Sequence, residues 1–344
     1  MSPLTALLLC DDRPGHYHLA EGVLAAARRL KPVDMIRLEV HRGRWPGAAL
    51  AAYVNAGLSP RWLLRTVYGL EARNLPQAQL IVSAGAETLA ANVAAARLLD
   101  APNIFYGSLR GFRPESFALV LTSYARYADR PRHVMTLKPS SIDPAALPVQ
   151  SGIQPLGPSR PPRLAGLLMG GDAGDFSYSA DDWSRLIGFL GETHQAWGTR
   201  WIVSNSRRTP DVVSDSVLPL AGGADGPIAE FIDVRAVGAG TLRGVFERVE
   251  AIVCTDDSST MVSEAISAWL PAVGVTPARH AFTKEERGYR NFLAGNGWYR
   301  SLPIAELTPG RLLAELMEIR PPKENPLDWL AEVLRERLPA IFAT

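Results

Sequence analysis

The amino-acid sequence predicts two α/β domains, each built around a parallel sheet with helices on both faces, and three observations lead to this fold class. The chain has 344 residues, which is too long for one comfortable hydrophobic core and suits two domains of ordinary size. Short β-rich runs alternate with longer helical patterns in both halves, as expected of parallel strands joined by crossover helices. A proline-rich segment with little periodicity separates the halves, which is typical of a stiff linker.

The first domain is predicted at residues 1–150. Its strands are the β-rich runs at residues 5–10, 34–40, 79–83, 103–106 and 117–122. Helical patterns lie between these runs, notably at 18–30 and 87–99. The alternation predicts a doubly wound, Rossmann-like half.

The second domain is predicted at residues 163–324, after a linker at 151–162 in the stretch where six prolines occur between Pro144 and Pro162. Its strands are expected at 163–169, 201–204, 231–234, 251–254 and 271–275, with a helix at 180–193. The last segment, 325–344, begins with a capping Asn and a Pro at the first helical position, which predicts a C-terminal helix that could cross back onto the first domain. The two domains are expected to face each other across a cleft, where ligands bind in such sheets.

The composition is 47% apolar and 21% charged, which is typical of a globular protein. No apolar run reaches the roughly 18 residues of a membrane-spanning helix. The N-terminus has no basic start and leads into Asp11 and Asp12, which favours a first strand over a secretory signal and therefore a cytoplasmic protein. Cys10 and Cys254 each end an apolar run and are expected to be small buried thiols.

Charge is distributed unevenly, because the first half is basic and the second acidic although the net charge is only +1. A basic half without a run of Lys or Arg favours an anionic acceptor or an anionic membrane surface over nucleic acid. A solvated surface with uneven charge is the alternative. His16 and His18 are close in sequence, but no Cys or carboxylate stands at a supporting spacing, so no metal site is expected there.

The segment that follows residues 251–254 is the strongest signal for a ligand. It is Thr255-Asp-Asp-Ser-Ser-Thr-Met-Val-Ser-Glu264 and leads directly into a helical pattern. A buried strand that ends in small hydroxyl residues and opens a helix presents backbone N–H groups and a positive dipole end, which suits a phosphate. Glu264 lies within the first two turns, where its carboxylate could bind a ribose hydroxyl, so the segment predicts a nucleotide-sugar site. The alternative is that Ser, Thr and Asp act here as ordinary helix N-caps.

Two further polar segments follow strands of the same predicted sheet. Gly170 and Gly171 come after the first strand of the second domain and would let the backbone approach a phosphate closely. Arg207 or Arg208, after the next strand, could neutralise a diphosphate bidentately, although surface arginines in a turn would have the same sequence.

The loop after the first strand of the first domain is Asp11-Asp-Arg-Pro-Gly-His-Tyr-His18. Asp12, Arg13 and His16 are expected to face the cleft, and Gly15 to permit a tight turn into the helix. These side chains are the candidates for acid–base chemistry on an acceptor.

Four sequence blocks together resemble the ELM-type mitochondrial-fission family, which occurs in plants and many bacteria. They are Asp-Arg-Pro-Gly-His at 12–16, Gly-Gly-Asp at 170–172, Ser-Arg-Arg-Thr-Pro at 206–210 and Asp-Ser-Ser-Thr-Met-Val-Ser-Glu-Ala at 257–265. The resemblance implies a bacterial member with the GT-B fold, because the family is regarded as a set of candidate glycosyltransferases of that fold. Bacterial members have also been labelled nucleoside-diphosphate-sugar epimerases.

The chain is more distantly similar to the lipid-linked N-acetylglucosamine transferase of peptidoglycan synthesis, on its Gly-His loop, its glycine loop and its Ser-Glu helix start. This similarity implies a donor pocket lined by Ser258, Ser259, Met261 and Glu264, with Glu264 on the ribose and His16 near the acceptor hydroxyl. The chain departs from that enzyme at residues 11–14, where Asp-Asp-Arg-Pro replaces a glycine-rich run, so the identity of the acceptor does not transfer.

The expected reaction is therefore transfer of a sugar from a nucleotide-diphosphate-sugar to an unknown acceptor, lipid-linked or an envelope glycan. His16 is the first candidate base, and Asp12 is either a second base or the group that orients His16. No cofactor or metal is expected, because a helix N-terminus, glycine amides and arginine can meet the charge on the diphosphate. The expected donor-binding residues are Gly170, Gly171, Asp172, Ser206, Arg207, Arg208, Asp257, Ser258, Ser259, Met261 and Glu264, and the expected acceptor-side residues are Arg13, Gly15 and His18.

Two other functions stay open. Epimerisation of a nucleotide-sugar would use the same donor pocket with an acid–base set drawn from His16, His280 and Glu285, which form no clear pair in the sequence. A membrane-associated scaffold with a vestigial nucleotide pocket is the third reading. The segment 59–70 predicts a capped helix that either packs into the core or contacts the inner face of an anionic membrane.

Overall fold

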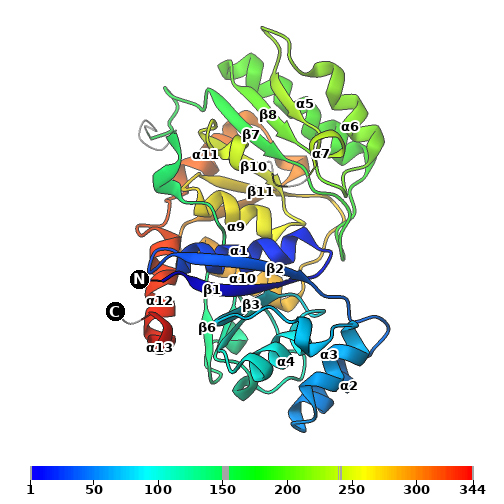
Figure 1. Ribbon diagram of the computed structural model, residues 1–344. Helices are drawn as coiled ribbons and strands as arrows, with labels where there is room; N and C mark the ends of the chain where they lie inside the picture. The colour runs from blue at the N-terminus through cyan, green and yellow to red at the C-terminus, as the bar shows by residue number, and fades with distance from the viewer. Residues whose placement is uncertain (1, 149–154, 239, 241, 343–344) are drawn as a thin grey trace. The chain divides into compact units, whose positions relative to one another are not determined.

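The computed structural model describes residues 2–148, 155–238, 240 and 242–342, and it shows two compact units (Figure 1). The first unit comprises the chain up to residue 141 and from 324 onward, and the second comprises residues 142–323. The first unit therefore ends at residue 141, whereas the sequence placed the end of the first domain at residue 150. Part of the expected linker, residues 151–154, lies outside the described residues.

The remainder of the expected linker, residues 155–162, belongs to the second unit. The carbonyl oxygen of Pro162 accepts a hydrogen bond from Thr199 Oγ1 at 2.6 Å, and Arg160 forms an ion pair with Glu250 at 2.7 Å. The many prolines of this segment do not predict these two contacts, because Thr199 and Glu250 are distant from it in the sequence. This segment is consequently tied to one unit along its length.

The first unit contains a six-stranded parallel sheet in the order β2-β1-β3-β4-β5-β6. Its strands are β1 (Leu4–Cys10), β2 (Val33–Glu39), β3 (Leu80–Ala84), β4 (Asn103–Tyr106), β5 (Leu119–Thr122) and β6 (His133–Met135). The order reverses between β1 and β3, which makes the sheet doubly wound, as the sequence predicted. Strand β6 was not predicted from the sequence, because a three-residue strand is too short to show a periodicity.

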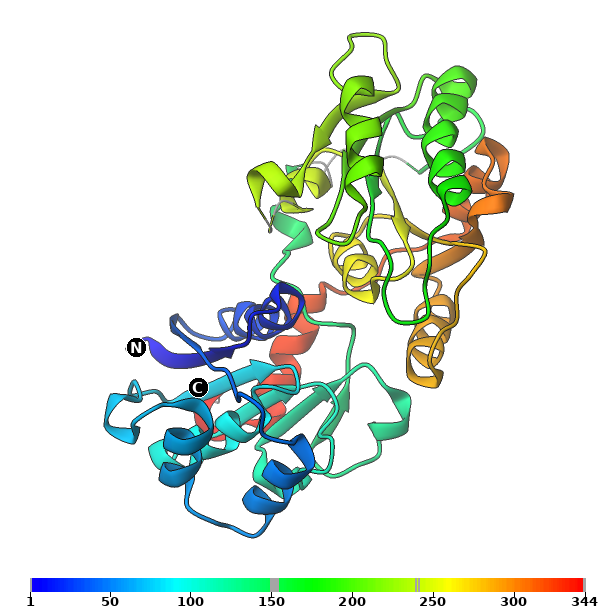
Figure 2. The same cartoon turned by 90° about the vertical axis from the view of Figure 1, so that its right-hand side faces the viewer.

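Alternation along β1 assigns the helices of the first unit to the two faces of the sheet. Leu8 packs in the apolar cluster with Leu24 of the first helix, whereas Leu7 and Leu9 belong to a separate cluster on the other face. The helices are α1 (Pro14–Ala27), α2 (Gly47–Asn55), α3 (Pro60–Tyr68), α4 (Leu89–Leu99), α12 (Pro326–Arg337) and α13 (Pro339–Phe342), with 3₁₀ turns η1 (Ala72–Asn74), η2 (Pro114–Ser116) and η3 (Ala125–Tyr127). Helix α12 lies against α1 (Figure 2), and Leu330 is buried in the same cluster as Leu24.

The second unit contains another six-stranded parallel sheet, in the order β12-β11-β10-β7-β8-β9. Its strands are β7 (Leu164–Leu168), β8 (Arg200–Ser204), β9 (Ile228–Ile232), β10 (Ala251–Thr255), β11 (Ala272–Thr276) and β12 (Tyr299–Pro303). Its helices are α5 (Ala180–Trp197), α6 (Asp211–Val217), α7 (Val234–Val237), α8 (Leu242–Phe246), α9 (Ser259–Ser267), α10 (Lys284–Gly295) and α11 (Pro309–Glu318), with 3₁₀ turns η4 (Pro144–Ala146), η6 (Leu218–Leu220) and η7 (Ile304–Glu306). The main core of this unit packs between one face of the sheet and α5 and α11.

In the described part of the chain, no helix combines the length and the apolar character needed to cross a lipid bilayer. Cys10 and Cys254 are both buried free thiols.

Candidate active site

Helix α9 begins where the sequence placed a ligand site. Strand β10 ends at Thr255, and Ser258 is the N-cap, whose side-chain oxygen accepts a hydrogen bond from the backbone N–H of Met261 at 3.4 Å. Ser259 is the first helical residue and is nearly buried. The ordinary capping role of Ser258 is therefore real, and it fixes the direction in which the first N–H groups of the helix point.

Asp257 connects three loops at the carboxyl edge of the second sheet. Its buried carboxylate accepts hydrogen bonds from the backbone N–H of Gly171 at 3.3 Å and from Tyr178 Oη at 3.1 Å, and it pairs with Arg208. Burial, reinforced by the charge of Asp257, raises the pKa of Tyr178, so the phenol stays protonated and donates. Asp257, expected from the sequence to contact the donor, thus has its oxygens engaged by the protein itself.

The two glycines after β7 are required by this arrangement. A Cβ on Gly170 would overlap the Asp257 carboxylate, and a Cβ on Gly171 would overlap the carbonyl oxygen of Arg208. The amide of Gly170 donates to Thr255 Oγ1 at 2.6 Å. Close approach of backbone to neighbouring loops explains why the sequence has glycine at both positions.

The loop after β8 is bonded to the same glycines. The carbonyl oxygen of Gly170 accepts hydrogen bonds from Ser206 Oγ at 3.2 Å and Thr209 Oγ1 at 2.6 Å. Arg207 is exposed and, within the described residues, forms no hydrogen bond or ion pair, which leaves its guanidinium available to a ligand. Asp172 instead accepts the backbone N–H of Tyr178 at 2.8 Å and closes its own turn.

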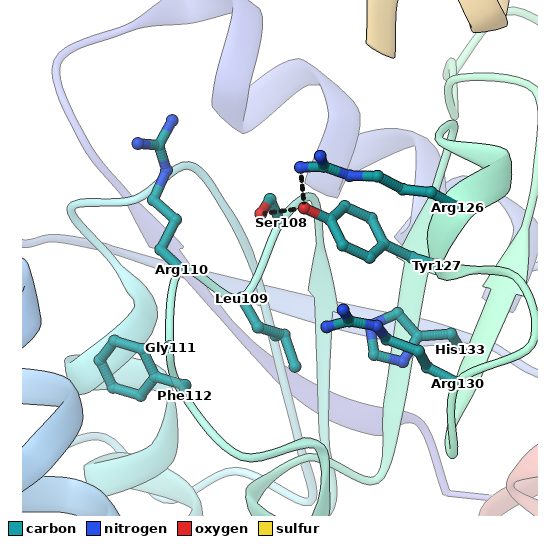
Figure 3. Close-up of a pocket in the computed structure, with 9 residues that line it drawn as sticks. All are labelled: Ser108, Leu109, Arg110, Gly111, Phe112, Arg126, Tyr127, Arg130 and His133. Atoms are coloured by element: carbon teal, nitrogen blue, oxygen red, sulfur yellow. Dashed lines mark hydrogen bonds between the residues drawn. The ribbon is translucent and has the colours of Figure 1, made fainter. Parts of the chain in front are cut away.

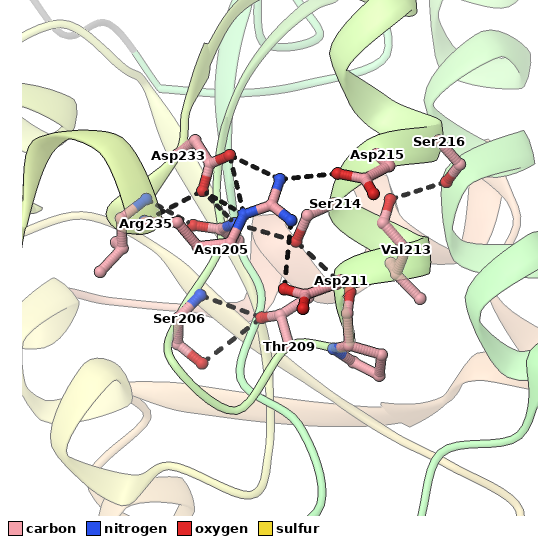
Figure 4. Close-up of polar contacts among 12 residues, drawn as sticks. Asn205, Ser206, Thr209, Asp211, Val213, Ser214, Asp215, Ser216, Asp233 and Arg235 are labelled. Carbon is pink, nitrogen blue, oxygen red and sulfur yellow. Dashed lines mark hydrogen bonds and ion pairs between the residues drawn. The ribbon is translucent and has the colours of Figure 1, made fainter.

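A polar cluster behind this loop holds it in place (Figure 4). Arg235 forms ion pairs with Asp211 at 3.1 Å, Asp215 at 2.9 Å and Asp233 at 2.7 Å. The hydrogen bonds from Arg235 are the main reason that the pKa of Asp233 falls to about 2. Asn205 joins the cluster to β8 through a 2.8 Å hydrogen bond from its amide nitrogen to Asp233.

A buried ion pair that no sequence pattern indicates joins Asp256, after β10, to Arg290. Asp256 is 1% exposed and accepts a hydrogen bond from Arg290 Nε at 2.7 Å, another from Ser301 Oγ at 3.1 Å, and one from Tyr299. Arg290 comes from α10, and its charge compensates that of Asp256 in the interior. The sequence indicated only that an aspartate stands beside Asp257, because no local pattern connects residues 256 and 290.

Glu264 is the last of the expected donor-site carboxylates along the chain. It lies on α9, is partly buried, and among the described residues has no hydrogen bond or ion pair to its carboxylate. Burial raises its pKa to about 7. A carboxylate in this position can accept a hydrogen bond from a ligand, and a ribose hydroxyl is one suitable donor.

In the first unit, His16 pairs with Asp11 and not with Asp12. His16 Nδ1 lies 2.6 Å from Asp11 Oδ2, and Asp11 Oδ1 accepts the backbone N–H of Arg13 at 3.1 Å. Burial works to raise the pKa of Asp11, but the hydrogen bond to His16 and the charge of that ring outweigh it, so the pKa is lowered. Asp12 is exposed, which corrects the expectation that it orients His16. The physical reason is that Asp11 comes directly after β1 and is buried at the sheet edge.

The remaining acceptor-side candidates lie around the start of α1. Gly15 has no positive φ and lies within α1, so it does not form the tight turn that the sequence suggested. Partial burial lowers the pKa of His18, and its Nε2 lies 4.0 Å from Glu21 Oε2. Gly85, which sequence reasoning missed, follows β3 with φ +92°, and a Cβ there would overlap the His16 ring.

The other potential acid–base residues are used differently. His280 packs against Phe176 and Phe282, with ring centroids 5.5 and 5.7 Å away, and its Nδ1 lies 2.8 Å from the carbonyl oxygen of Pro277. Glu285 lies in the first turn of α10. In the described ranges, no group of three or more His, Cys, Asp or Glu side chains could hold a metal ion.

Two doubly wound parallel sheets in one chain, with polar loops at their carboxyl edges, place this protein in the GT-B class. A sequence profile described as mitochondrial fission ELM1 matches residues 14–338, so the chain belongs to that family. A search of curated proteins finds no match.

Solved structures agree on the fold. A candidate UDP-N-acetylglucosamine 2-epimerase from Listeria monocytogenes has a TM-score of 0.55 at 11% identity, with 98% of each chain covered. The UDP-GlcNAc 2-epimerase from Neisseria meningitidis, solved with UDP-GlcNAc bound, has a TM-score of 0.53 at 10% identity, covering 98% of this chain and 100% of that one. MurG from Acinetobacter baumannii has a TM-score of 0.49 at 13% identity, covering 96% of this chain and 99% of that one, and this score is too low to support the fold assignment. At such identities the likeness concerns the fold alone.

Proposed function

We propose that this protein is a metal-independent glycosyltransferase that moves a sugar from a nucleoside-diphosphate-sugar to an acceptor hydroxyl. The observation that supports it most is the joining of the loops after β7, β8 and β10 around Asp257. In these contacts Asp257 and Arg208 are bonded within the protein, whereas Arg207 and Glu264 have no partners among the described residues. A site held rigid by its own contacts and presenting an unpaired cation and carboxylate suits a diphosphate and a ribose.

Binding of the diphosphate would use the start of α9. Ser258 fixes this helix start, so its backbone N–H groups and dipole are aimed before the ligand arrives. Arg207 adds an exposed guanidinium, whereas the amide of Gly171 is already bonded to Asp257. Developing negative charge on the leaving diphosphate is met by fixed dipoles and arginine, which is why the proposal includes no metal.

The proposed general base is His16. Because Asp11 bonds to Nδ1, Nε2 is the ring nitrogen left to accept a proton. As the acceptor oxygen bonds to the anomeric carbon, its proton moves to Nε2, and the bond from that carbon to the diphosphate oxygen breaks with its electron pair. Asp11 stabilises the imidazolium that results.

Contact with an anionic membrane is proposed for the α2–α3 face of the first unit. Trp45 and Trp62 are 39% and 42% exposed, their rings are 5.9 Å apart, and Tyr53 stacks on Trp62 at 4.9 Å. The exposed Arg61 precedes Trp62 on α3, and exposed aromatic rings with arginine are typical of a membrane interface. Sedimentation with vesicles containing phosphatidylglycerol should be weakened in Trp62→Ala, and equal sedimentation of both proteins would contradict the contact.

The test of the donor site is thermal stabilisation by UDP, GDP, CMP, dTDP and their sugars. One nucleotide is expected to raise the melting temperature, and Arg207→Gln should lose most of that rise. Arg287→Gln, an exposed arginine of α10 in the same unit, is the matched control and should keep it. A rise unaffected by Arg207→Gln would remove this arginine from the site, and no rise with any nucleotide would contradict the proposal.

Turnover then separates transfer from epimerisation. Incubation of the stabilising nucleotide-sugar without acceptor should leave the sugar configuration unchanged, whereas an epimerase would convert it. Addition of EDTA should leave transfer unchanged. Loss of transfer with EDTA and its return with Mg²⁺ would refute the metal-free mechanism.

A further inference from the structure

The first unit contains a pocket of about 320 Å³ that neither the helix start nor the His16 pair uses (Figure 3). Residues 108–112 follow β4, and Arg126 and Tyr127 follow β5, so most of the lining comes from loops that leave the carboxyl edge of the sheet. The same edge carries Asp11 after β1. The pocket lining consists of Ser108, Leu109, Arg110, Gly111, Phe112, Arg126, Tyr127, Arg130 and His133.

The lining is strongly cationic. It contains three arginines and a histidine but no aspartate or glutamate. Neither Arg110 nor Arg130 forms an ion pair within the described ranges. Gathering guanidinium groups around one cavity costs Coulomb energy, which an anion in the cavity would repay.

Tyr127 holds two of the arginines in position. The guanidinium carbons of Arg126 and Arg130 lie 4.5 and 4.8 Å from the centre of its ring, and the Tyr127 hydroxyl lies 3.3 Å from Ser108 Oγ and accepts a hydrogen bond from Arg126. Tyr127 itself is buried, so the ring is a fixed platform. Stacking on the ring restrains both guanidinium groups, and within the described residues the guanidinium of Arg130 forms no hydrogen bond or ion pair.

The opposite wall has an unusual backbone. Arg110 has φ +46° and lies between Gly107 with φ +132° and Gly111 with φ +95°. An arginine in the left-handed region is strained by roughly 1 kcal/mol or more. The loop therefore keeps a costly conformation that places a third guanidinium at the rim of the pocket.

We propose that this pocket binds a phosphate or diphosphate group carried by the acceptor. Three arginines favour phosphate over carboxylate, because several bidentate N–H pairs match its three oxygens. The volume suits a diphosphate with part of an attached sugar and is at the small end of ligand pockets. Assignment of the bound group to the acceptor depends on the proposed function, whereas anion binding does not.

The test is calorimetric titration of the full chain with inorganic pyrophosphate in the presence of UDP. Arg110→Gln/Arg130→Gln should weaken pyrophosphate binding by about tenfold or more, since each charge-assisted hydrogen bond lost contributes to affinity. Arg73→Gln, an exposed arginine of η1 in the same unit, is the matched control and should bind within about twofold of wild type. Equal affinities for wild type and the double variant, or no binding to wild type, would overturn the proposal.

Two further measurements separate the sources and the hypotheses. Geranylgeranyl diphosphate in detergent should bind more tightly than pyrophosphate if the acceptor is lipid-linked, and no more tightly if it is a soluble sugar phosphate. Stabilisation by nucleotide should persist in the double variant and be lost in Arg207→Gln. Failure of the pocket would therefore leave the nucleotide response intact, and failure of the donor site would leave pyrophosphate binding intact.

Discussion

Replacement of Glu264 by glutamine should remove a pH dependence from the stability of the second unit. Burial raises the pKa of this carboxyl from its ordinary 4.5 to about 7. Below pH 4.5 the group is protonated in both the folded and the unfolded protein, and between pH 4.5 and 7 only the folded protein holds the proton. The folded state is therefore destabilised relative to the unfolded one as the pH rises through this window.

The magnitude follows from the same values. One pKa unit corresponds to about 1.4 kcal/mol, so full burial would cost about 3 kcal/mol above pH 7. Because the side chain of Glu264 is partly exposed, solvent screening reduces the expected effect to about 2 kcal/mol. Glutamine is nearly isosteric and stays neutral, so Glu264→Gln should gain that amount relative to wild type between pH 4.5 and pH 8.5.

Urea unfolding at pH 4.5, 6, 7 and 8.5, followed by tryptophan fluorescence, measures this difference. Glu318→Gln, an exposed glutamate of α11 in the same unit, is the control and should show the pH dependence of wild type. A difference between Glu264→Gln and wild type that does not change with pH would refute the reasoning. A difference of opposite sign would mean that a cation stabilises the carboxylate.

Three other variants test the site. In Gly171→Ala the new Cβ would overlap the backbone carbonyl of Arg208, which cannot move away as a side chain could. We expect this variant to lose about 1–3 kcal/mol of stability and the nucleotide-induced rise in melting temperature. An unchanged rise would contradict this expectation. Asp11→Asn should lower kcat of transfer roughly 100-fold with little change in donor KM, because His16 loses the carboxylate that orients its ring and stabilises its charged form. An equal kcat would show that Asp11 has no such role. Asp256→Asn removes the nearer ionic partner of the buried Arg290, whose Nη1 keeps only Glu286 at 3.5 Å, and should cost about 3 kcal/mol in urea unfolding. A cost below 1 kcal/mol would show that the pair is not isolated from water.

Patterns within short stretches of sequence were sufficient for much of this protein. The apolar runs that became β1 and β10 were visible because strands buried on both faces are continuous in hydrophobic residues. The cap at Ser258 was visible because capping is a contact between residues three apart. By contrast, β6 and β12 were missed, since β6 has only three residues and β12 mixes Arg300 and Ser301 with apolar residues.

The partners of site residues could not be predicted in this way. Asp11 and Asp12 are adjacent in the sequence, and only the position of β1 in the sheet buries the first and exposes the second. Arg290 pairs with Asp256 across more than thirty residues, a separation over which no local pattern acts. The arginine pocket depends likewise on two loops that meet only because β4 and β5 are neighbours in the sheet.

The sequence by itself thus determined the class of fold, the family blocks and the place of the capped helix start at Ser258, because each depends on periodicity or on residues a few positions apart. Tertiary structure alone decided which aspartate holds His16, which arginine is consumed by Asp257, and where three arginines gather. These are contacts between segments far apart along the chain, and hydrogen bonds and ion pairs over a few ångströms exist only once the sheets have brought those segments together.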